Sequence, residues 1–386
     1  MNIQYVTLGR VEFGLWTPAR VDLPPLAAKA EEAGFDYLHL YDSQALYAET
    51  FACLALCAEH TRELKLGHGV TNPVTRIAQL MASGLATINQ LAPGRTFLAI
   101  GTGYSTMQAM GLPPAKLADL RTYIEQVRAL LRGEQIEITF RGRTRTIGMV
   151  QGPGSLDDTF VNLRDPIPVY VAAAGPKALA LAGELADGVI LSIKTPGDAD
   201  FGYVREHLAI GAARVGRDPG SIPIIVQMNV YVMAPGEEFG SRAMKESVLG
   251  VWQSVVGNWA ARRAPKPGKL ERVDGTSVPE EFAELANAYR AAVQEKTGTQ
   301  PLDGDAWYLQ AYDGHAWRFH PDLLEHATDD FLRPRAFIAE PDEIVAKFKE
   351  WEDLGIVAVG AQVQHDIAHG AELVERFGEH IIPHFK

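Results

Sequence analysis

The sequence predicts an α/β protein in which eight strand–helix units close into a (β/α)8 TIM barrel. Apolar runs rich in Val, Ile, Leu and Ala alternate along the 386 residues with segments of helical periodicity. Strands of nearly continuous apolar sequence are buried on both faces, as in a parallel sheet covered by helices. Eight such strands are the number that closes into a barrel with a packed interior. We therefore favour a closed barrel over a doubly wound open sheet.

The first four strand–helix units are expected before residue 132. Pro24 and Pro25 fit the first turn of a helix, and Gly34 fits its end. After the fourth helix, a polar hairpin with Arg141-Gly142-Arg143 at its turn leaves the barrel pattern. The expected elements are a strand at 11–18, a helix at 23–33, a strand at 35–41, a helix at 50–60, a strand at 64–70, a helix at 76–91, a strand at 96–100, a helix at 115–131 and the hairpin at 136–150.

The alternation resumes after the hairpin and runs to the last residues. Glu340-Pro341-Asp342-Glu343 has the proline and acidic residues typical of a helix N-terminus. The expected elements are a strand at 167–173, a helix at 176–185, a strand at 188–193, a helix at 203–215, a seventh strand at 222–233, a helix at 341–354, an eighth strand at 356–363 and a closing helix at 369–382.

Residues 235–335 are too many for one loop, so we expect a helical insertion within a single domain spanning 1–386. Helical patterns cover 242–261 and 279–294, and four of the six tryptophans lie in this stretch. An insertion that follows a barrel strand emerges at the face where barrel enzymes carry their chemistry. A lid, a substrate pocket and a dimer contact all remain open for it.

Composition and charge exclude several classes of protein. The formal net charge of −12, with acidic residues spread along the chain, disfavours nucleic acid and anionic membrane as partners. The sequence has no secretory signal pattern and no apolar run of 18 residues, so we expect a cytoplasmic protein. Cys53 and Cys57 lack redox or zinc spacing, and we expect two small buried hydrophobic residues. We find no His/Asp/Glu spacing that indicates a metal site.

Small, turn-forming residues end the third and fourth expected strands. These segments are Gly69-Val70-Thr71-Asn72-Pro73 and Gly101-Thr102-Gly103-Tyr104-Ser105. Glycine at a strand end lets a flat ring or a phosphate approach the main chain more closely than a Cβ allows. The two segments therefore indicate an enzyme that binds a flat, phosphorylated cofactor.

A third segment, Gly175-Pro176-Lys177, opens a helix directly after a strand. The unpaired N–H groups at such a terminus and the helix dipole favour an anion. Gly101-Thr102-Gly103 lacks the third glycine of the dinucleotide fingerprint, so a Rossmann-type site is disfavoured.

These segments resemble the bacterial luciferase-like flavin oxidoreductases, and more closely their branch that uses the deazaflavin coenzyme F420, which includes methylenetetrahydromethanopterin reductase. They occur in the family's order and cover most of the chain outside the insertion. The resemblance is carried by Tyr41-Asp42-Ser43-Gln44, Gly69-Val70-Thr71-Asn72-Pro73, Gly101-Thr102-Gly103-Tyr104-Ser105, Val169-Tyr170-Val171-Ala172-Ala173-Ala174-Gly175-Pro176-Lys177, Glu184-Leu185-Ala186-Asp187-Gly188-Val189-Ile190 and Phe377-Gly378-Glu379-His380-Ile381-Ile382-Pro383.

The resemblance implies a third strand that ends near Gly69 and Val70 in a bulge, often with a non-proline cis peptide, against the central ring of the cofactor. It also implies that the turns after strand four and before the helix at Pro176 hold the cofactor's phosphate. The cofactor-binding residues expected on this basis are Asp42, Gly69, Val70, Thr71, Asn72, Gly101, Thr102, Gly103, Tyr104, Ser105, Ala173, Ala174, Gly175, Pro176 and Lys177.

Asp42 is also the expected catalytic residue, because family members carry an Asp close to the ring at this place. Its carboxylate could bind cofactor or substrate or transfer a proton, and a helix N-cap is the structural alternative. This sequence departs from much of the family at Ser43, where a catalytic His often stands. A hydroxyl is a poor base near neutral pH, so the proton donor or acceptor stays open.

Further candidates follow from barrel geometry, because residues just past the carboxyl ends of strands face the site. His365, beside Asp366, is the second expected catalytic residue by position and type. His320, in the insertion, is another candidate, and Thr17, Asn229 and Gln362 share the strand-end position. The expected substrate contacts are Trp16, Ser43, Gln44, His68, Lys194, Gln227 and Gln364.

Three functions are compatible with these residues. The first is F420-dependent hydride transfer to or from a small organic substrate. The second is a monooxygenase that takes FMNH2, reduced FMN, from a separate reductase. The third is a barrel that binds flavin without catalysis. No NAD(P)H-binding segment is visible, so reduced cofactor must come from another protein, and the resemblance implies a homo-oligomer, either a dimer or a tetramer.

Overall fold

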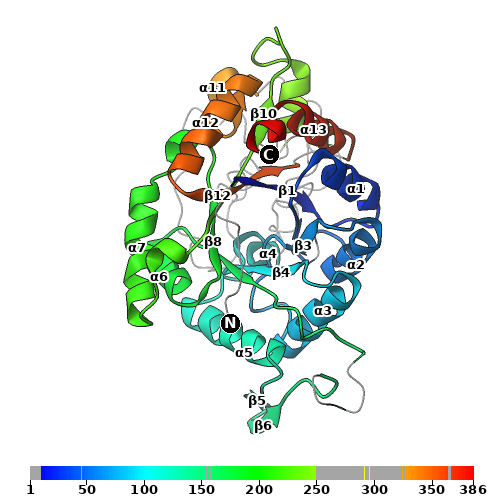
Figure 1. Ribbon diagram of the computed structural model, residues 1–386, viewed down its shortest axis with the longest axis vertical. Helices are drawn as coiled ribbons and strands as arrows, with labels where there is room; N and C mark the ends of the chain where they lie inside the picture. The colour runs from blue at the N-terminus through cyan, green and yellow to red at the C-terminus, as the bar shows by residue number, and fades with distance from the viewer. Residues whose placement is uncertain are drawn as a thin grey trace.

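Eight parallel strands form a closed barrel in the order β1-β12-β9-β8-β7-β4-β3-β2, with helices around it (Figure 1). The predicted fold class is confirmed. The computed structural model describes residues 10–44, 46–152, 155, 159–248, 291, 295, 324, 327–363 and 367–386. The barrel strands are β1 (Glu12–Pro18), β2 (Tyr37–Tyr41), β3 (Lys65–His68), β4 (Thr96–Ile100), β7 (Val169–Ala172), β8 (Gly188–Ser192), β9 (Ile224–Met228) and β12 (Ile356–Gln362).

Helices follow the strands as the apolar periodicity predicts. Three expected elements, at 50–60, 96–100 and 176–185, have the observed bounds, and most others differ by one to three residues. The helices are α1 (Pro24–Ala33), α2 (Thr50–His60), α3 (Ala78–Leu91), α4 (Tyr104–Ala109), α5 (Leu117–Leu131), α6 (Pro176–Leu185), α7 (Phe201–Arg214), α11 (Asp329–Leu332), α12 (Pro341–Asp353) and α13 (Ile367–His380), with short 3-10 turns at Pro196–Asp198, Pro219–Ser221 and Ile382–Phe385.

The predicted seventh strand at 222–233 is wrong as one element. The chain leaves the barrel at Asn229, after β9, and β10 (Val230–Val232) pairs in parallel with β11 (Phe337–Ala339), a strand the sequence did not predict. The Asn229 carbonyl accepts from the backbone N–H of Phe337, and its side-chain amide donates to the Arg335 carbonyl. These long-range bonds end the strand inside a mostly apolar run.

The third strand and the helix after it are shorter than predicted. β3 stops at His68, and α3 starts at Ala78 rather than at Arg76. The Asn72 side-chain oxygen accepts from the backbone N–H groups of Val74 and Thr75, so a turn replaces the expected start of the helix. Residues 69–77 are therefore a loop at the carboxyl end of β3.

The predicted hairpin at 136–150 is present as β5 (Ile136–Phe140) and β6 (Arg143–Ile147), outside the ring of strands (Figure 1). In the predicted insertion, residues 242–248 are helical, while most of 249–326 falls outside the described residues. Cys53 and Cys57 are buried thiols, as expected. Among the described helices, none combines the length and the apolar character needed to cross a membrane.

Bulky rings fill the middle of the barrel. Trp16 is fully buried and stacks on His39 with ring centroids 3.5 Å apart. Phe97 lies 4.6 Å from His39 and 5.7 Å from Tyr170, again between ring centroids. A Cβ at Gly360 would come within 1.6 Å of the Trp16 ring, so this glycine makes room for the indole. The interior is thus closed by aromatic packing below its carboxyl-terminal mouth.

Gly360→Ala should lower the free energy of unfolding by about 1–3 kcal/mol, because the new methyl displaces the Trp16 ring from a packed interior. Urea denaturation measures the loss. Gly148→Ala is the matched control, since its Cβ would meet Gln135 at an ordinary 3.4 Å. Equal stability of the two variants would contradict the packing described.

Candidate functional site

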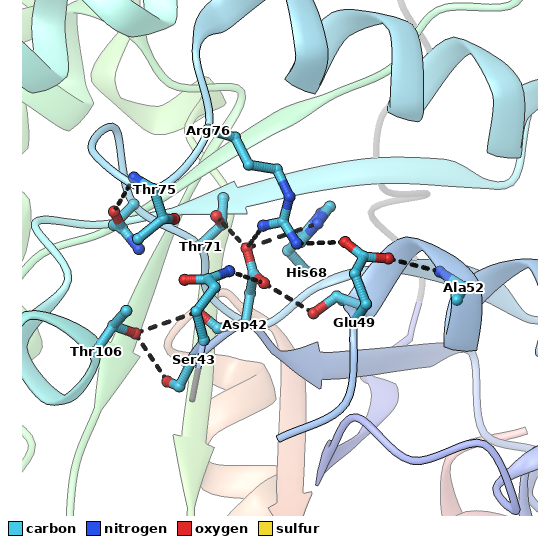
Figure 2. Close-up of polar contacts among 12 residues, drawn as sticks. Asp42, Ser43, Glu49, Ala52, His68, Thr71, Thr75, Arg76 and Thr106 are labelled. Carbon is cyan, nitrogen blue, oxygen red and sulfur yellow. Dashed lines mark hydrogen bonds and ion pairs between the residues drawn. The ribbon is translucent and has the colours of Figure 1, made fainter. Parts of the chain in front are cut away.

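The loop after β2 places the carboxylate of Asp42 at the centre of a buried polar cluster (Figure 2). Four side chains donate to this carboxylate. Gln44 and Thr50 donate to Oδ1 at 2.7 and 2.8 Å, Thr71 donates to Oδ2 at 2.5 Å, and Arg76 donates to Oδ2 as well. The donors come from the loops after β2 and β3 and from α2, so one carboxylate joins three segments.

Arg76 supplies the positive charge of the cluster. Its second terminal nitrogen donates to Glu49 at 2.5 Å, and Glu49 in turn accepts from the backbone N–H of Ala52 at the start of α2. The side chains of Arg76 and Asp42 are only 8% and 2% exposed. A pair buried to this degree is screened little by solvent, and losing one partner would leave an uncompensated charge.

Asp42 is held in its ionised form. Burial by itself raises the pKa of a carboxyl, but the attraction of His68, which is protonated in the acid range where Asp42 titrates, the charge of Arg76 and the hydrogen bond from Thr71 outweigh it. The pKa of Asp42 therefore lies below its usual value. Four donors and a low pKa suit a carboxylate that fixes its neighbours better than one that accepts a proton.

His68, an expected substrate contact, faces the helix layer and not the barrel mouth. It is fully buried, packs edge-on against Phe51 of α2 at 4.8 Å, and lies 3.9 Å from Asp42. Neither ring nitrogen has a hydrogen-bond partner within the described structure. Burial lowers the pKa of His68 to about 4, so the ring is neutral near pH 7 and Arg76 is the cation that faces Asp42.

The segment from Gly69 to Asn72 is held from both sides. The Gly69 N–H donates to the Leu40 carbonyl of β2, while the Thr71 N–H donates to the Ala99 carbonyl of β4. The Thr71 carbonyl accepts from the Gly101 N–H at 3.0 Å. The Gly69–Val70 peptide is cis, as the family resemblance implies.

The loop after β4 joins the same structure. Ser43 and Thr106 of α4 form a hydroxyl–hydroxyl bond of 2.8 Å, and the Thr106 hydroxyl donates to the Asp42 carbonyl at 3.2 Å. Gly103 has a φ of +81°, and a Cβ there would lie 2.6 Å from the Asn72 Cβ. The predicted segments after β2, β3 and β4 are thus in contact with one another.

The inward-facing side chains become smaller towards the carboxyl-terminal mouth of the barrel. Alternate residues of a barrel strand point inward, so Gly101, Ala172 and Ser192 lie one inward position above Ala99, Tyr170 and Ile190. Gln227 pairs with Gly360 of β12, Gln362 is the next inward position on that strand, and both glutamines are half-buried. Small and amide side chains thus follow the rings towards the mouth of the barrel.

The N-terminus of α6 is open to solvent beside this layer. Ala174, Gly175, Pro176 and Lys177 are all exposed, and Ala173 is buried under them. Gly175 is the N-cap with a φ of −82°, and nothing lies within 4 Å of a Cβ built there. The free N–H groups of this terminus can therefore receive an anion.

The remaining predicted residues are spread over the rim. Tyr104 is 50% exposed, Thr102 and Ser105 are half-buried, and Lys194 is exposed after β8. Trp16, expected to contact substrate, is fully buried inside the barrel, and its Nε1 lies 3.1 Å from a Cβ built on Gly69. Gln364, His365 and His320 fall outside the described residues.

Sequence reasoning missed Arg76, Glu49, Thr50 and Thr106. Arg76 was predicted as the first residue of a helix at 76–91, and nothing in the pattern marks it as buried. The available signal was indirect: an Asp at a buried strand end, if ionised, needs a cation or several donors nearby.

A sequence model of the luciferase-like monooxygenase family matches residues 1–358 of the chain. The chain belongs to this family. The predicted family is therefore confirmed, and as a luciferase-like oxidoreductase the chain is an enzyme, which sets aside a purely binding barrel.

Two relatives and one solved structure illustrate the similarity. The chain is 27% identical over 364 residues to 5,10-methylenetetrahydromethanopterin reductase of Archaeoglobus fulgidus, covering 92% of this chain and 93% of the relative. It is 26% identical over 388 residues to F420-dependent glucose-6-phosphate dehydrogenase of Beutenbergia cavernae, covering 95% and 93%. The solved coenzyme F420-dependent tetrahydromethanopterin reductase of Methanopyrus kandleri superposes with a TM-score of 0.63 at 22% identity, covering 98% of this chain and all of that one, which shows the shared fold.

His68→Leu should reduce the fall in the free energy of unfolding between pH 7.5 and pH 5. The pKa of His68 is lowered in the folded state, so its contribution is complete above pH 6.5 and is lost as pH falls towards 4. At pH 5 the wild type should have lost about 2 kcal/mol through this residue, and the variant should not. Urea unfolding at pH 7.5 and pH 5 measures the difference.

His60→Leu is the control, because His60 is exposed on α2 and should leave the profile unchanged. An equal fall in the free energy of unfolding between pH 7.5 and pH 5 in the wild type and in His68→Leu would contradict this prediction. It would show that His68 is protonated in the folded protein without loss of stability.

Proposed function

We propose that this enzyme binds the deazaflavin coenzyme F420 at the carboxyl-terminal mouth of the barrel and transfers a hydride to or from a small organic substrate. The observation that carries the proposal is the alignment, over more than nine-tenths of the chain, with relatives whose names specify F420 or a pterin reductase. The loops after β3 and β4 and the N-terminus of α6 support the proposal, because their residues suit a flat ring with a phosphate.

The fit of the cofactor to this chain rests on three features. Gly101 and Ala172 place no large side chain at the mouth of the barrel. The Asn72 side-chain Nδ2 is buried without a partner among the described residues. The α6 N-terminus offers unpaired N–H groups and Lys177 for a phosphate. In this proposal the segment Gly69–Asn72 supports the ring, and Gly175–Lys177 hold the phosphate.

When bound, the deazaflavin supplies a ring carbon that accepts or gives up a hydride. The protein's own residues fix the ring in the geometry that transfer needs and exclude water. Asp42, ionised and saturated with donors, positions the rim. His365 stays a prediction as the proton donor or acceptor.

An FMNH2-dependent monooxygenase is the second candidate, because the matching family model describes luciferase-like monooxygenases. The same rim would hold FMN, and a separate reductase would deliver it in reduced form. The two candidates differ in the bound ring and in the use of oxygen.

Titration with each cofactor separates the candidates. Oxidised F420 should quench tryptophan fluorescence with a micromolar Kd, and reduced FMN should bind at least tenfold more weakly without accelerating oxygen uptake. Fluorescence and an oxygen electrode measure the two effects. Preferential binding of reduced FMN with rapid oxygen consumption would favour the monooxygenase, and binding of neither would reject both.

Gly175→Asp should weaken F420 binding at least tenfold, because a carboxylate at the helix N-terminus repels the cofactor's phosphate. The melting temperature should stay the same or rise, since Asp is a good N-cap and the site is open. Fluorescence titration and thermal melting measure the two effects.

Gly175→Ala is the matched control, because nothing lies within 4 Å of the added Cβ and a methyl group neither carries charge nor caps the helix, and it should bind nearly as well as the wild type. Equal affinity of the Asp and Ala variants would place the phosphate elsewhere.

A further inference from the structure

We propose that Arg76 is a positioning residue of the cofactor site, which clamps the Asp42 carboxylate and thereby fixes the segment Gly69–Asn72. The inference rests on the proposed function for its role in cofactor binding. The clamp itself is independent of which cofactor binds.

Arg76 connects two loops that the barrel alone does not hold together. It lies in the loop after β3, while Asp42 and Glu49, its two carboxylate partners, lie in the connection between β2 and α2. Its guanidinium also lies 5.4 Å from the centre of the Phe51 ring, so both its charge and its plane are fixed.

The clamp reaches the rim through one hydroxyl. Asp42 Oδ2, which accepts from Arg76, also accepts from the Thr71 side chain at 2.5 Å. Thr71 exchanges backbone hydrogen bonds with Ala99 and Gly101 of the neighbouring strand and loop. Protonation of Asp42 Oδ2, or loss of its Arg76 partner, therefore acts directly on Thr71. This residue joins the loop after β3 to β4 and the loop after it.

The surroundings of Asp42 make Arg76 the decisive cation. The titratable groups that face Asp42 are Arg76, His68 of β3, Glu49 before α2 and Tyr123 of α5. Burial raises the pKa of Tyr123 and lowers the pKa of His68 to about 4, so neither group is a cation near pH 7. Without Arg76, burial of Asp42 is opposed only by His68 and the neutral donors, so the pKa of Asp42 should rise, and a protonated Asp42 would compete with Thr71 as donor.

Arg76→Met and Arg76→Lys test the clamp by titration with F420 between pH 5.5 and 8.5. The wild type should bind with a flat pH profile, and the Lys variant should keep that flat profile with a smaller loss of affinity than the Met variant, because Lys keeps a cation beside Asp42 but lacks the second nitrogen that binds Glu49. The Met variant should bind at least tenfold more weakly at pH 5.5 and recover affinity as pH rises, because its Asp42 ionises only then. A Met variant with wild-type affinity and a flat profile would overturn the proposal.

Arg10→Met is the matched control. Arg10 pairs with Asp36 at 2.5 Å just before β2, at the opposite end of that strand from Asp42. This variant should lose stability without a change in cofactor affinity. A loss of affinity equal to that of Arg76→Met would reduce the effect to general destabilisation and overturn the proposal.

Urea unfolding without cofactor tests the clamp separately from the proposed function. In Arg76→Met the folded-state pKa of Asp42 should exceed its unfolded value, so the urea midpoint should fall, relative to the wild type, as pH rises from 5 to 8. Adding Asp42→Asn should remove this pH dependence. If these unfolding results are obtained but the wild type does not bind F420, the proposed function is rejected and the Asp42–Arg76 clamp still stands. A pH dependence unaffected by either substitution would reject the clamp.

Discussion

The buried ion pair between Asp42 and Arg76 is the constraint on which the mouth of this barrel depends. Closing eight strands fixes the direction of each chain segment but not the conformation of the loops that follow. Here one carboxylate accepts from Gln44, Thr50, Thr71 and Arg76, and these donors bring together loops that are separate in the sequence. Ser43 and Thr106 extend the contact to α4, so three adjacent loops behave as one surface.

Below that surface, the barrel uses two different kinds of packing. Trp16, His39, Phe97 and Tyr170 fill the middle with stacked and tilted rings, and glycines such as Gly360 provide their space. Above them the inward positions are small or amide side chains. The rings fill the interior, and in the proposed function the small residues above them leave room for a flat ligand. Stability and ligand binding would then depend on successive layers of the same strands.

Much of the fold follows from sequence periodicity, because each barrel strand is covered on both faces and each helix has one buried side. The helices at 50–60 and 176–185 were predicted to the residue. The break at Asn229 was not, because it depends on hydrogen bonds to residues more than 100 positions away. Local patterns carry no information on such a partner.

The sequence predicted where the candidate site residues lie along the chain, but not the hydrogen bonds and ion pairs between them. Glycine and small polar residues at strand ends marked Gly69–Asn72, Gly101–Ser105 and Gly175–Lys177, and the structure brings the first two together. The role of Arg76 depends on the turn made by Asn72, which moves Arg76 out of the expected helix and into the cluster. His68 likewise faces the helix layer, because β3 ends at this residue and the side-chain alternation of the strand sets its direction.

A crystal structure of the enzyme with oxidised F420 tests the central claim most directly. The account predicts the ring over Gly69–Asn72 and Gly101, with the phosphate at the amide groups of Gly175–Lys177 and the Asp42–Arg76 pair intact beneath the rim. A ring bound elsewhere, or a complex in which Asp42 has left Arg76 to contact the ligand, would contradict it.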